Sequence, residues 1–223
     1  MKYAVLTDFQ MLTPEISNGI IELASDVEHL KKNVFISNGY AIRQSASKEE
    51  KLLGEYRTYQ DERLNGGDGY FAVANLTKDL EQLIIKQIPK CLQHLGIPRI
   101  RFQVLKDFIL FPHIDQGRKT SLFTMVTDNR GIDCVFWEKT KEHELFENHL
   151  PDPSLIKQKL NFSVNQGETC LFDHDCIHGT LTKSSQPRIT LNLSYQLTIP
   201  EMLKEIYKGT LLSRISINLK ISI

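Results

Sequence analysis

PRITLNLSYQL, the stretch from Pro187 to Leu197, alternates strictly between polar and apolar side chains. This two-residue period predicts a β-strand with one polar and one apolar face. The polar face carries Arg188, Thr190, Asn192, Ser194 and Gln196. If the apolar face packs under helices, the polar face looks into a barrel interior, which is unusual for a strand that only fills a core. We therefore expect this interior to hold a polar ligand.

Strand-like runs dominate the chain after residue 98. Many strands with turn residues between them indicate a sandwich or a barrel. The predicted fold is mostly β with flanking α: a double-stranded β-helix (jelly roll, cupin-like) with N-terminal helices packed on the sheet. The runs lie at about residues 101–106, 108–115, 119–127, 132–138, 159–165, 169–178 and 187–197.

Two helices are expected before these strands. Thr13 and Pro14 match an N-cap and a first helical position, and apolar residues then recur at helical spacing up to residue 32. The second helix should begin at Thr77 and end at Gly96, with Pro89 bending or breaking it.

The length and composition suit one soluble domain. At 223 residues the chain can bury a sizeable core, and 41% hydrophobic with 24% charged residues is ordinary for a globular protein. We expect a single domain over residues 1–223. Residues 1–98 should give mainly helical support and a lid, residues 99–198 the jelly-roll core, and residues 199–223 a C-terminal helix and strand.

Charge, hydropathy and cysteine content exclude several classes of partner. Lys+Arg 27 balances Asp+Glu 27, so the chain has no global attraction to nucleic acid or to an anionic membrane. No stretch approaches the ~20 apolar residues of a membrane helix. The cysteines lack zinc-site or CxxC spacing, which favours a reducing compartment, and we expect a cytoplasmic protein. They are Cys91, Cys134, Cys170 and Cys176.

A set of metal-ligand residues accompanies the polar-faced strand. His113 and Asp115 lie two positions apart in an apolar run, where a strand would point both side chains the same way. His178 comes much later and must arrive from another strand. Two imidazoles and a carboxylate can hold one face of a divalent metal and leave the opposite face open. Arg188 follows ten positions after His178 and adds a cation on the polar face.

These residues resemble the HxD…H…R(x)S/T pattern of the Fe(II)/2-oxoglutarate-dependent dioxygenases. The matching motifs are His113-Ile114-Asp115, His178-Gly179-Thr180 and Pro187-Arg188-Ile189-Thr190. The segment from Gly167 to Asp173 is similar to the aspartyl/asparaginyl and proline hydroxylase branch, and it also resembles phytanoyl-CoA-hydroxylase-like members. The resemblance covers about residues 99–198.

The resemblance implies a role for each residue. His113, Asp115 and His178 would ligate Fe(II), while Arg188 would pair with the distal carboxylate of 2-oxoglutarate and Thr190 would hydrogen-bond the same group. The implied reaction uses O2, hydroxylates an amino acid or an amino-acid-derived or peptidyl substrate, and releases succinate and CO2. The carboxylate of Asp115 speaks against a halogenase, which has a small residue at that position.

Two other functions stay open. The chain could be a non-catalytic cupin-like module that binds a metal or ligand without turnover. A zinc hydrolase could use the same ligands, but it would not need Arg188 and Thr190 aimed inward. His174 shares the strand parity of His178 and stays a candidate ligand, although a place behind the ligands or in solvent is favoured.

Two polar stretches, residues 43–69 and 140–158, are candidate lids that could choose the substrate. Candidate substrate contacts are Arg43, Arg57, Gln103, Arg118 and Trp137, with a surface ion pair, or a core position for Trp137, as the competing interpretation. The remaining histidines are expected to be solvated or to cap helices: His29, His94, His143 and His149.

The C-terminal run from Ile215 to Ile223 alternates without a break and predicts a strand with an apolar face. An unpaired strand of this kind invites aggregation. We therefore expect it to join the sheet or to pair with a second subunit in a homodimer.

Overall fold

A computed structural model describes residues 4–26, 34–37, 70–110, 112–115, 118–140, 155–182, 184–213 and 219–222. Within these ranges, no helix is long and apolar enough to span a bilayer. Several positions singled out above lie outside them: residues 43–69, most of the 140–158 stretch, His29, His143 and His149.

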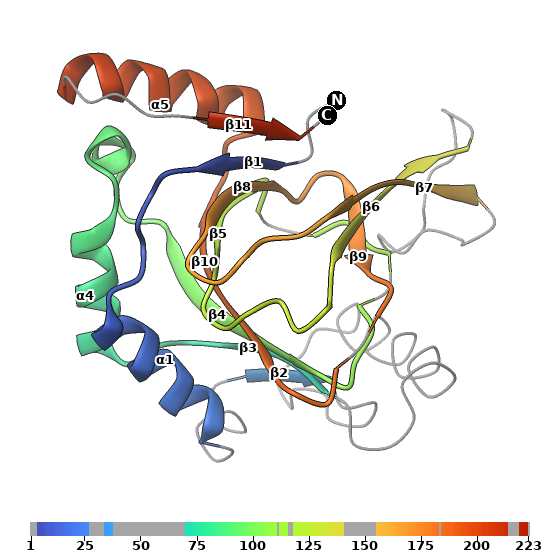
Figure 1. The fold of residues 1–223 in the computed structure, drawn as a ribbon. Helices are drawn as coiled ribbons and strands as arrows, with labels where there is room; N and C mark the ends of the chain where they lie inside the picture. The colour runs from blue at the N-terminus through green and yellow to red at the C-terminus, as the bar shows by residue number, and fades with distance from the viewer. Residues whose placement is uncertain are drawn as a thin grey trace.

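Antiparallel strands form the body of the protein. Their bounds are β1 (Ala4–Thr7), β2 (Val34–Ser37), β3 (Tyr70–Ala74), β4 (Arg99–Lys106), β5 (Thr120–Met125), β6 (Cys134–Lys139), β7 (Ile156–Phe162), β8 (Thr169–Asp173), β9 (Ile177–Thr180), β10 (Arg188–Tyr195) and β11 (Leu219–Ser222). In the described part of the chain, eight of them form one sheet in the order β11-β1-β8-β5-β10-β4-β3-β2, and three form a smaller sheet in the order β7-β6-β9. Figure 1 shows the smaller sheet facing the larger one.

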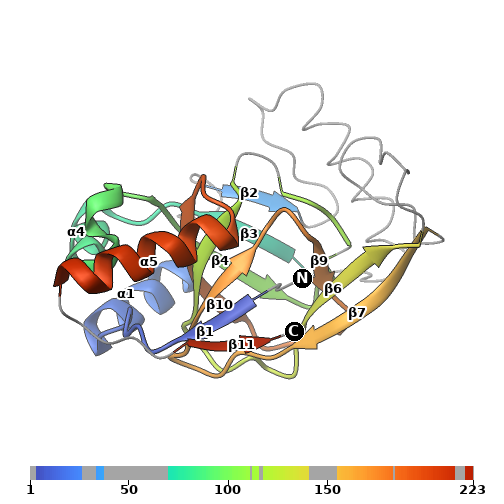
Figure 2. The ribbon, with the colours of Figure 1, turned by 90° about the horizontal axis from the view of Figure 1, so that it is seen from above.

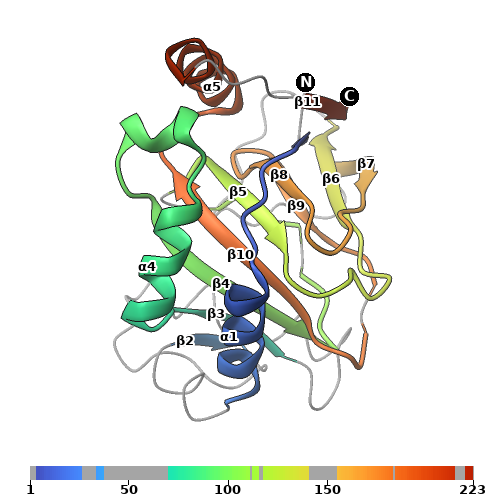
Figure 3. The ribbon, with the colours of Figure 1, turned by 60° about the vertical axis from the view of Figure 1, so that its left-hand side comes forward.

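Between β4 and β10 the chain passes back and forth between the two sheets, as in a double-stranded β-helix. Strands β4, β5, β8 and β10 are neighbours in the larger sheet, whereas β6, β7 and β9 form the smaller sheet. The segment around His113 extends the smaller sheet, because His113 pairs with His178 on β9. Figure 3 shows β4, β10 and β5 side by side, with the smaller sheet beyond them. The predicted jelly roll is confirmed.

Helices cover the outer face of the larger sheet. They are α1 (Pro14–Ser25), α4 (Lys78–Gln87), α5 (Ile199–Ser213) and the 3-10 helix η1 (Lys90–Leu95), and Figure 2 shows them grouped on one side of the strands. Their buried residues share a core with Ile189, Leu191 and Leu193 of β10. Burial of one such side chain contributes about 1.5–3 kcal/mol. The apolar face of β10 therefore packs under helices, as predicted.

The predicted helix starts are confirmed and one predicted end is wrong. Thr13 Oγ1 accepts a hydrogen bond from the Ile16 amide, and Thr77 caps α4 in the same way. Helix α1 ends at Ser25 instead of continuing to residue 32. The hydroxyl of Ser25 donates to the carbonyl of Ile21 at 2.8 Å and satisfies one of the last helical acceptors.

Pro89 breaks the second predicted helix, because proline has no amide hydrogen to donate. Helix α4 ends at Gln87, and the chain resumes as η1 until Gly96. Gly96 has a φ of 81°, a conformation that glycine adopts without strain.

The described residues of the predicted strand at 108–115 do not form a strand. Asp107 has a φ of 46° and turns the chain, and Pro112 cannot donate to a ladder. What remains is an isolated bridge at His113. Asp115 therefore reaches the site from an irregular segment, not from a strand.

The predicted strand at 169–178 is two strands. The Asp173 carboxylate accepts a hydrogen bond from the Asp175 amide at 2.9 Å, which makes a local turn. Strand β8 ends at Asp173 in the larger sheet, and β9 begins at Ile177 in the smaller one. This turn moves His178 to the sheet opposite β10.

The first third of the chain supplies strands as well as the expected helices. Strands β2 and β3 extend the larger sheet beyond β4, and β1 lies between β8 and β11. Strand β11 joins the sheet as predicted, with Ile221 opposite Val5. Figure 1 shows β1 and β11 side by side at this edge.

Candidate metal centre

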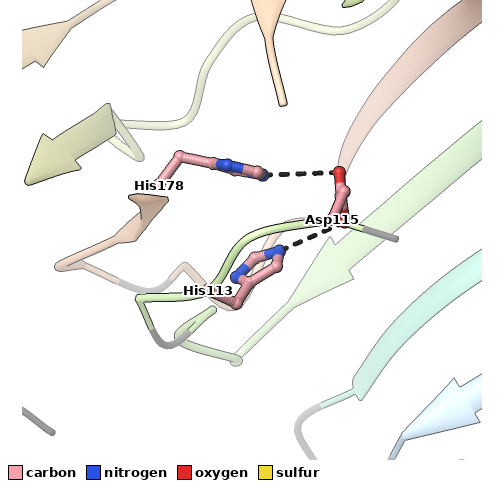
Figure 4. Close-up of side chains that lie close together, drawn as sticks. All are labelled: His113, Asp115 and His178. Carbon is pink, nitrogen blue, oxygen red and sulfur yellow. Dashed lines mark ion pairs between the residues drawn. The ribbon is translucent and has the colours of Figure 1, made fainter. Parts of the chain in front are cut away.

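His113 and His178 stand directly opposite each other. The amide of each donates to the carbonyl of the other at 2.9 Å. Residues paired in this way on antiparallel segments point their side chains to the same face. Their ring centroids lie 4.4 Å apart, and both rings are turned toward Asp115 in Figure 4.

The three side chains offer donors at distances that one metal could bridge. His113 Nε2 lies 3.6 Å from Asp115 Oδ1, and His178 Nε2 lies 3.5 Å from Asp115 Oδ2. One ligand atom from each residue lies within 4.8 Å of the others. Ligands at about 2.1 Å from a metal stand roughly 3–4 Å apart. Two imidazole nitrogens and a carboxylate oxygen also match the donor set of a mononuclear Fe(II) site. These residues therefore fit a divalent metal.

The backbone sets the tautomer of His178. Its Nδ1 lies 2.9 Å from the carbonyl oxygen of Cys176. Because a carbonyl oxygen can only accept, Nδ1 carries the proton in the neutral ring. Nε2 then keeps its lone pair toward the site, which is the arrangement common for metal-binding histidines.

Asp115 is held as an anion. Arg118 Nε and Nη2 lie 2.8 and 2.7 Å from Oδ2. Burial acts to raise the pKa of Asp115, but the Arg118 charge and the contacts with His174 and His178 hold the pKa well below its ordinary value. Arg118, a candidate substrate contact from sequence, is instead the ion-pair partner of this carboxylate.

Arg188 is buried between the two sheets, with 4% of its surface exposed. Its Nη2 donates to the thiol sulfur of Cys134 at 3.1 Å, and its guanidinium lies 5.6 Å from the centre of the Phe123 ring. Within the described residues, Nε has no hydrogen-bond partner and no acidic group forms an ion pair with Arg188. A buried cation without an anion is costly, so this position fits an anionic ligand.

Thr190 follows Arg188 on the same face of β10 and is also buried. Its hydroxyl accepts a hydrogen bond from Asn192 Nδ2 at 3.2 Å and lies 3.5 Å from Gln103 Oε1. The register places Gln103 of β4 directly opposite Thr190. Gln103 therefore lies beside the polar face of β10, as a residue contacting a ligand there would.

The remaining residues singled out from the sequence are not among the three grouped donors, or they lie outside the described residues. Trp137 belongs to an apolar cluster on the smaller sheet and is a core residue. His94 lies near the surface, with Nε2 2.7 Å from Glu205 Oε2. Arg43 and Arg57 lie outside the described residues.

His174 is neither solvent-facing nor among the three grouped donors. It is 2% exposed, and its Nδ1 lies 2.5 Å from Asp115 Oδ2, short but not aligned as a regular hydrogen bond. Its Nε2 lies 2.7 Å from Ser121 Oγ. Burial and the Arg118 charge lower the pKa of His174 to about 3 against the opposing effect of Asp115, so the ring is neutral at pH 7.

Ser121 and Cys134 were not anticipated from sequence. Both contact a predicted site residue or its neighbour, Ser121 through His174 and Cys134 through Arg188. No local motif marks either of them. The strand register, which brings β5 and β6 next to β10 and β9, is what places them.

No protein-family model matches the sequence, and no curated protein matches it. Among solved structures, the chain is similar to the Escherichia coli ribosomal oxygenase YcfD, with a TM-score of 0.38, 8% identity, and coverage of 66% of this chain and 37% of that one. It is similar to HygX from Streptomyces hygroscopicus, solved with nickel, 2-oxoglutarate and hygromycin B, at a TM-score of 0.39, 13% identity and coverage of 84% and 88%.

The chain is also similar to vicilin from hazelnut, Corylus avellana, with a TM-score of 0.32, 13% identity and coverage of 57% of this chain and 29% of that one. The chain thus spans about a third of the ribosomal oxygenase and of the vicilin. These similarities are too distant to assign a fold or an activity. The fold assignment rests on the order of the strands described above.

Proposed function

We propose that this protein is an Fe(II)- and 2-oxoglutarate-dependent oxygenase. One observation carries the proposal: a three-donor metal site and a buried arginine without an acidic partner, among the described residues, lie in the interior of one jelly roll. A metal-only site, such as that of a zinc hydrolase, explains the first feature and leaves the second without a purpose.

Arg188 is the residue that points to a dicarboxylate cosubstrate. Its guanidinium keeps its charge at any pH of interest and presents several donors in one plane. A carboxylate can accept two parallel hydrogen bonds from such a group. Thr190 lies two positions further along the same buried face, where its hydroxyl can donate to the same carboxylate. A 2-oxo acid with a second carboxylate could then reach both the arginine and the metal.

The metal site supports the other half of the proposal. His113 and His178 would bind through Nε2, and Asp115 would supply the negative charge. A bound Fe(II) would supply the O2 chemistry for hydroxylation, with succinate and CO2 as the products from the cosubstrate. The protein's task is to hold these donors rigidly and to keep Asp115 ionised, which Arg118 does.

For the substrate, we propose an amino acid or an amino-acid-derived or peptidyl molecule. The support is the motif resemblance to the aspartyl/asparaginyl and proline hydroxylases. A panel of free amino acids and short peptides, assayed for a mass increase of one oxygen atom, tests this choice. Uniform failure of the panel would leave the cosubstrate proposal standing and remove the substrate proposal.

The function is tested by loading metal-free protein anaerobically with Fe(II), adding 2-oxoglutarate and then oxygen, and measuring succinate without any substrate. We expect slow succinate formation that needs both iron and oxygen. Tight iron binding without succinate formation or oxygen consumption across the substrate panel would instead favour the cupin-like binding module. Failure to bind either iron or 2-oxoglutarate would refute the proposal.

A further inference from the structure

His174 contacts the candidate metal carboxylate from outside the ligand set. It lies in the turn between β8 and β9, and its Nδ1 is 2.5 Å from Asp115 Oδ2. The backbone supports the same approach, because the Asp115 amide donates to the His174 carbonyl at 3.3 Å and the His174 amide donates to the Lys119 carbonyl at 2.8 Å. His174 is therefore fixed against Asp115 by both its ring and its main chain.

The neighbours of His174 determine where its ring carries a proton. A lone pair on Nδ1 would face a carboxylate oxygen at 2.5 Å, so Nδ1 carries the proton. Nε2 can then accept the hydroxyl proton of Ser121, 2.7 Å away. Ser121 also lies 3.5 Å from Asn192 Oδ1, and Asn192 donates to Thr190. A connected set of buried polar groups of this kind holds its members rigidly.

Oδ2 of Asp115 is occupied by donors from two sides. Arg118 reaches it with Nε and Nη2 at 2.8 and 2.7 Å, and His174 reaches it with Nδ1. Arg118 supplies two of these contacts, and the His174 ring adds a third close contact on the same oxygen. Oδ1 instead faces His113 Nε2 at 3.6 Å. Oδ2 also lies 3.5 Å from His178 Nε2, so both oxygens face the candidate metal ligands while Arg118 and His174 contact Oδ2.

We propose that His174 is a positioning residue that holds the Asp115 carboxylate in place for metal binding. The inference rests on the proposed metal site and goes beyond it by assigning a fourth residue with a defined atom and proton. Removing a residue that orients a metal ligand typically weakens metal affinity about 10–100-fold.

The test compares metal binding by three variants, with Mn(II) titrated calorimetrically into metal-free protein. His174→Leu replaces the ring with an apolar side chain of moderate size that has no hydrogen-bond donor. This variant should bind Mn(II) about 10–100-fold more weakly than wild type. His174→Asn places an amide nitrogen where Nδ1 stands. Its affinity for Mn(II) should therefore be within a few-fold of the wild-type affinity. His94→Leu is the matched control, because it removes a histidine–carboxylate contact outside the site, and it should bind as wild type does.

Each outcome supports or overturns the positioning role of His174. Thermal unfolding of the metal-free variants shows whether they fold, and Ser121→Ala, which removes only the hydroxyl behind His174, gives a second variant that should weaken Mn(II) binding in the same direction by a smaller factor. Wild-type affinity in folded His174→Leu, or in Ser121→Ala if His174→Leu does not fold, would overturn the assignment. Mn(II) affinity in His174→Asn as low as in His174→Leu would also overturn the assignment. Failure of wild type to bind Mn(II) or Fe(II) would overturn the proposed function itself.

Discussion

Arg188 Nη2 donates to the sulfur of Cys134 across 3.1 Å, between the two sheets of the jelly roll. A thiol is a weak acceptor for a group that carries a full positive charge. The Phe123 ring lies 5.6 Å from the guanidinium and adds a cation–π contact. These neighbours orient the guanidinium without neutralising it, which is how a site for an anionic ligand is prepared.

Arg188→Met should lose 2-oxoglutarate and keep the metal. Truncating one partner of a buried charged pair costs about 2 kcal/mol or more of binding free energy. This corresponds to about a 30-fold larger dissociation constant for 2-oxoglutarate. Calorimetric titration of 2-oxoglutarate into Mn(II)-loaded protein measures this change, and a parallel Mn(II) titration is the control. Unchanged 2-oxoglutarate affinity, or loss of Mn(II) binding with retained 2-oxoglutarate binding, would contradict the assignment of Arg188.

His178→Ala should abolish metal-induced stabilisation. A ligand that binds only the folded state stabilises it by about 2.7 kcal/mol when present at 100 times its dissociation constant. Wild type should therefore unfold at a higher temperature with Mn(II) than without, whereas His178→Ala should show no difference. His94→Ala serves as the control and should respond as wild type does. A persisting Mn(II) response in His178→Ala would show that the metal binds elsewhere.

The stability of the metal-free protein should depend on Asp115 at acid pH. Burial acts to raise the Asp115 pKa, but the Arg118 charge and the histidine contacts hold the pKa well below its ordinary value. Such a group stabilises the folded state above its unfolded pKa of about 3.9, and the contribution is lost as the pH falls through the folded pKa.

Urea unfolding of wild type and Asp115→Asn checks this dependence. The difference in free energy of unfolding between them should be constant from pH 7 to about pH 5 and should shrink at lower pH. A difference that stays constant down to pH 3 would show that the Asp115 pKa is not lowered by folding.

Deleting residues 214–223 should make the protein associate. Strand β11 pairs with β1 through registers such as Ile221 opposite Val5, so its loss leaves the backbone groups along one side of β1 without partners. Exposed sheet edges of this kind template pairing with other chains. Size-exclusion chromatography with light scattering should show larger species for the truncated protein.

A single Ile221→Pro substitution tests the same edge, because proline removes one backbone donor, and it should act in the same direction more weakly. An unchanged mass distribution for both variants would argue against a role of β11 in protecting the edge. A full-length dimer that becomes monomeric on deletion would instead support pairing of two subunits through this strand.

Local patterns predicted the elements whose chemistry is local. Thr13 and Thr77 mark helix starts, and Pro89 marks a break, because capping and the missing proline amide act within one helical turn. The alternation after Arg188 predicted both faces of β10 for the same reason. Strands β1, β2 and β3 were not predicted, because each is short and pairs with a strand far along the chain.

The sequence by itself determined the residue types of the site and the strand that carries Arg188 and Thr190, because strand periodicity and side-chain chemistry are properties of neighbours in the chain. It could not separate His174 from His178, which share the same parity. Only the tertiary structure decided between them: the turn at Asp173 sends His178 across to face His113, while His174 stays behind Asp115. The physical reason is that strand pairing and buried contacts join residues far apart in sequence, and these contacts determine which side chains can meet at a single ion.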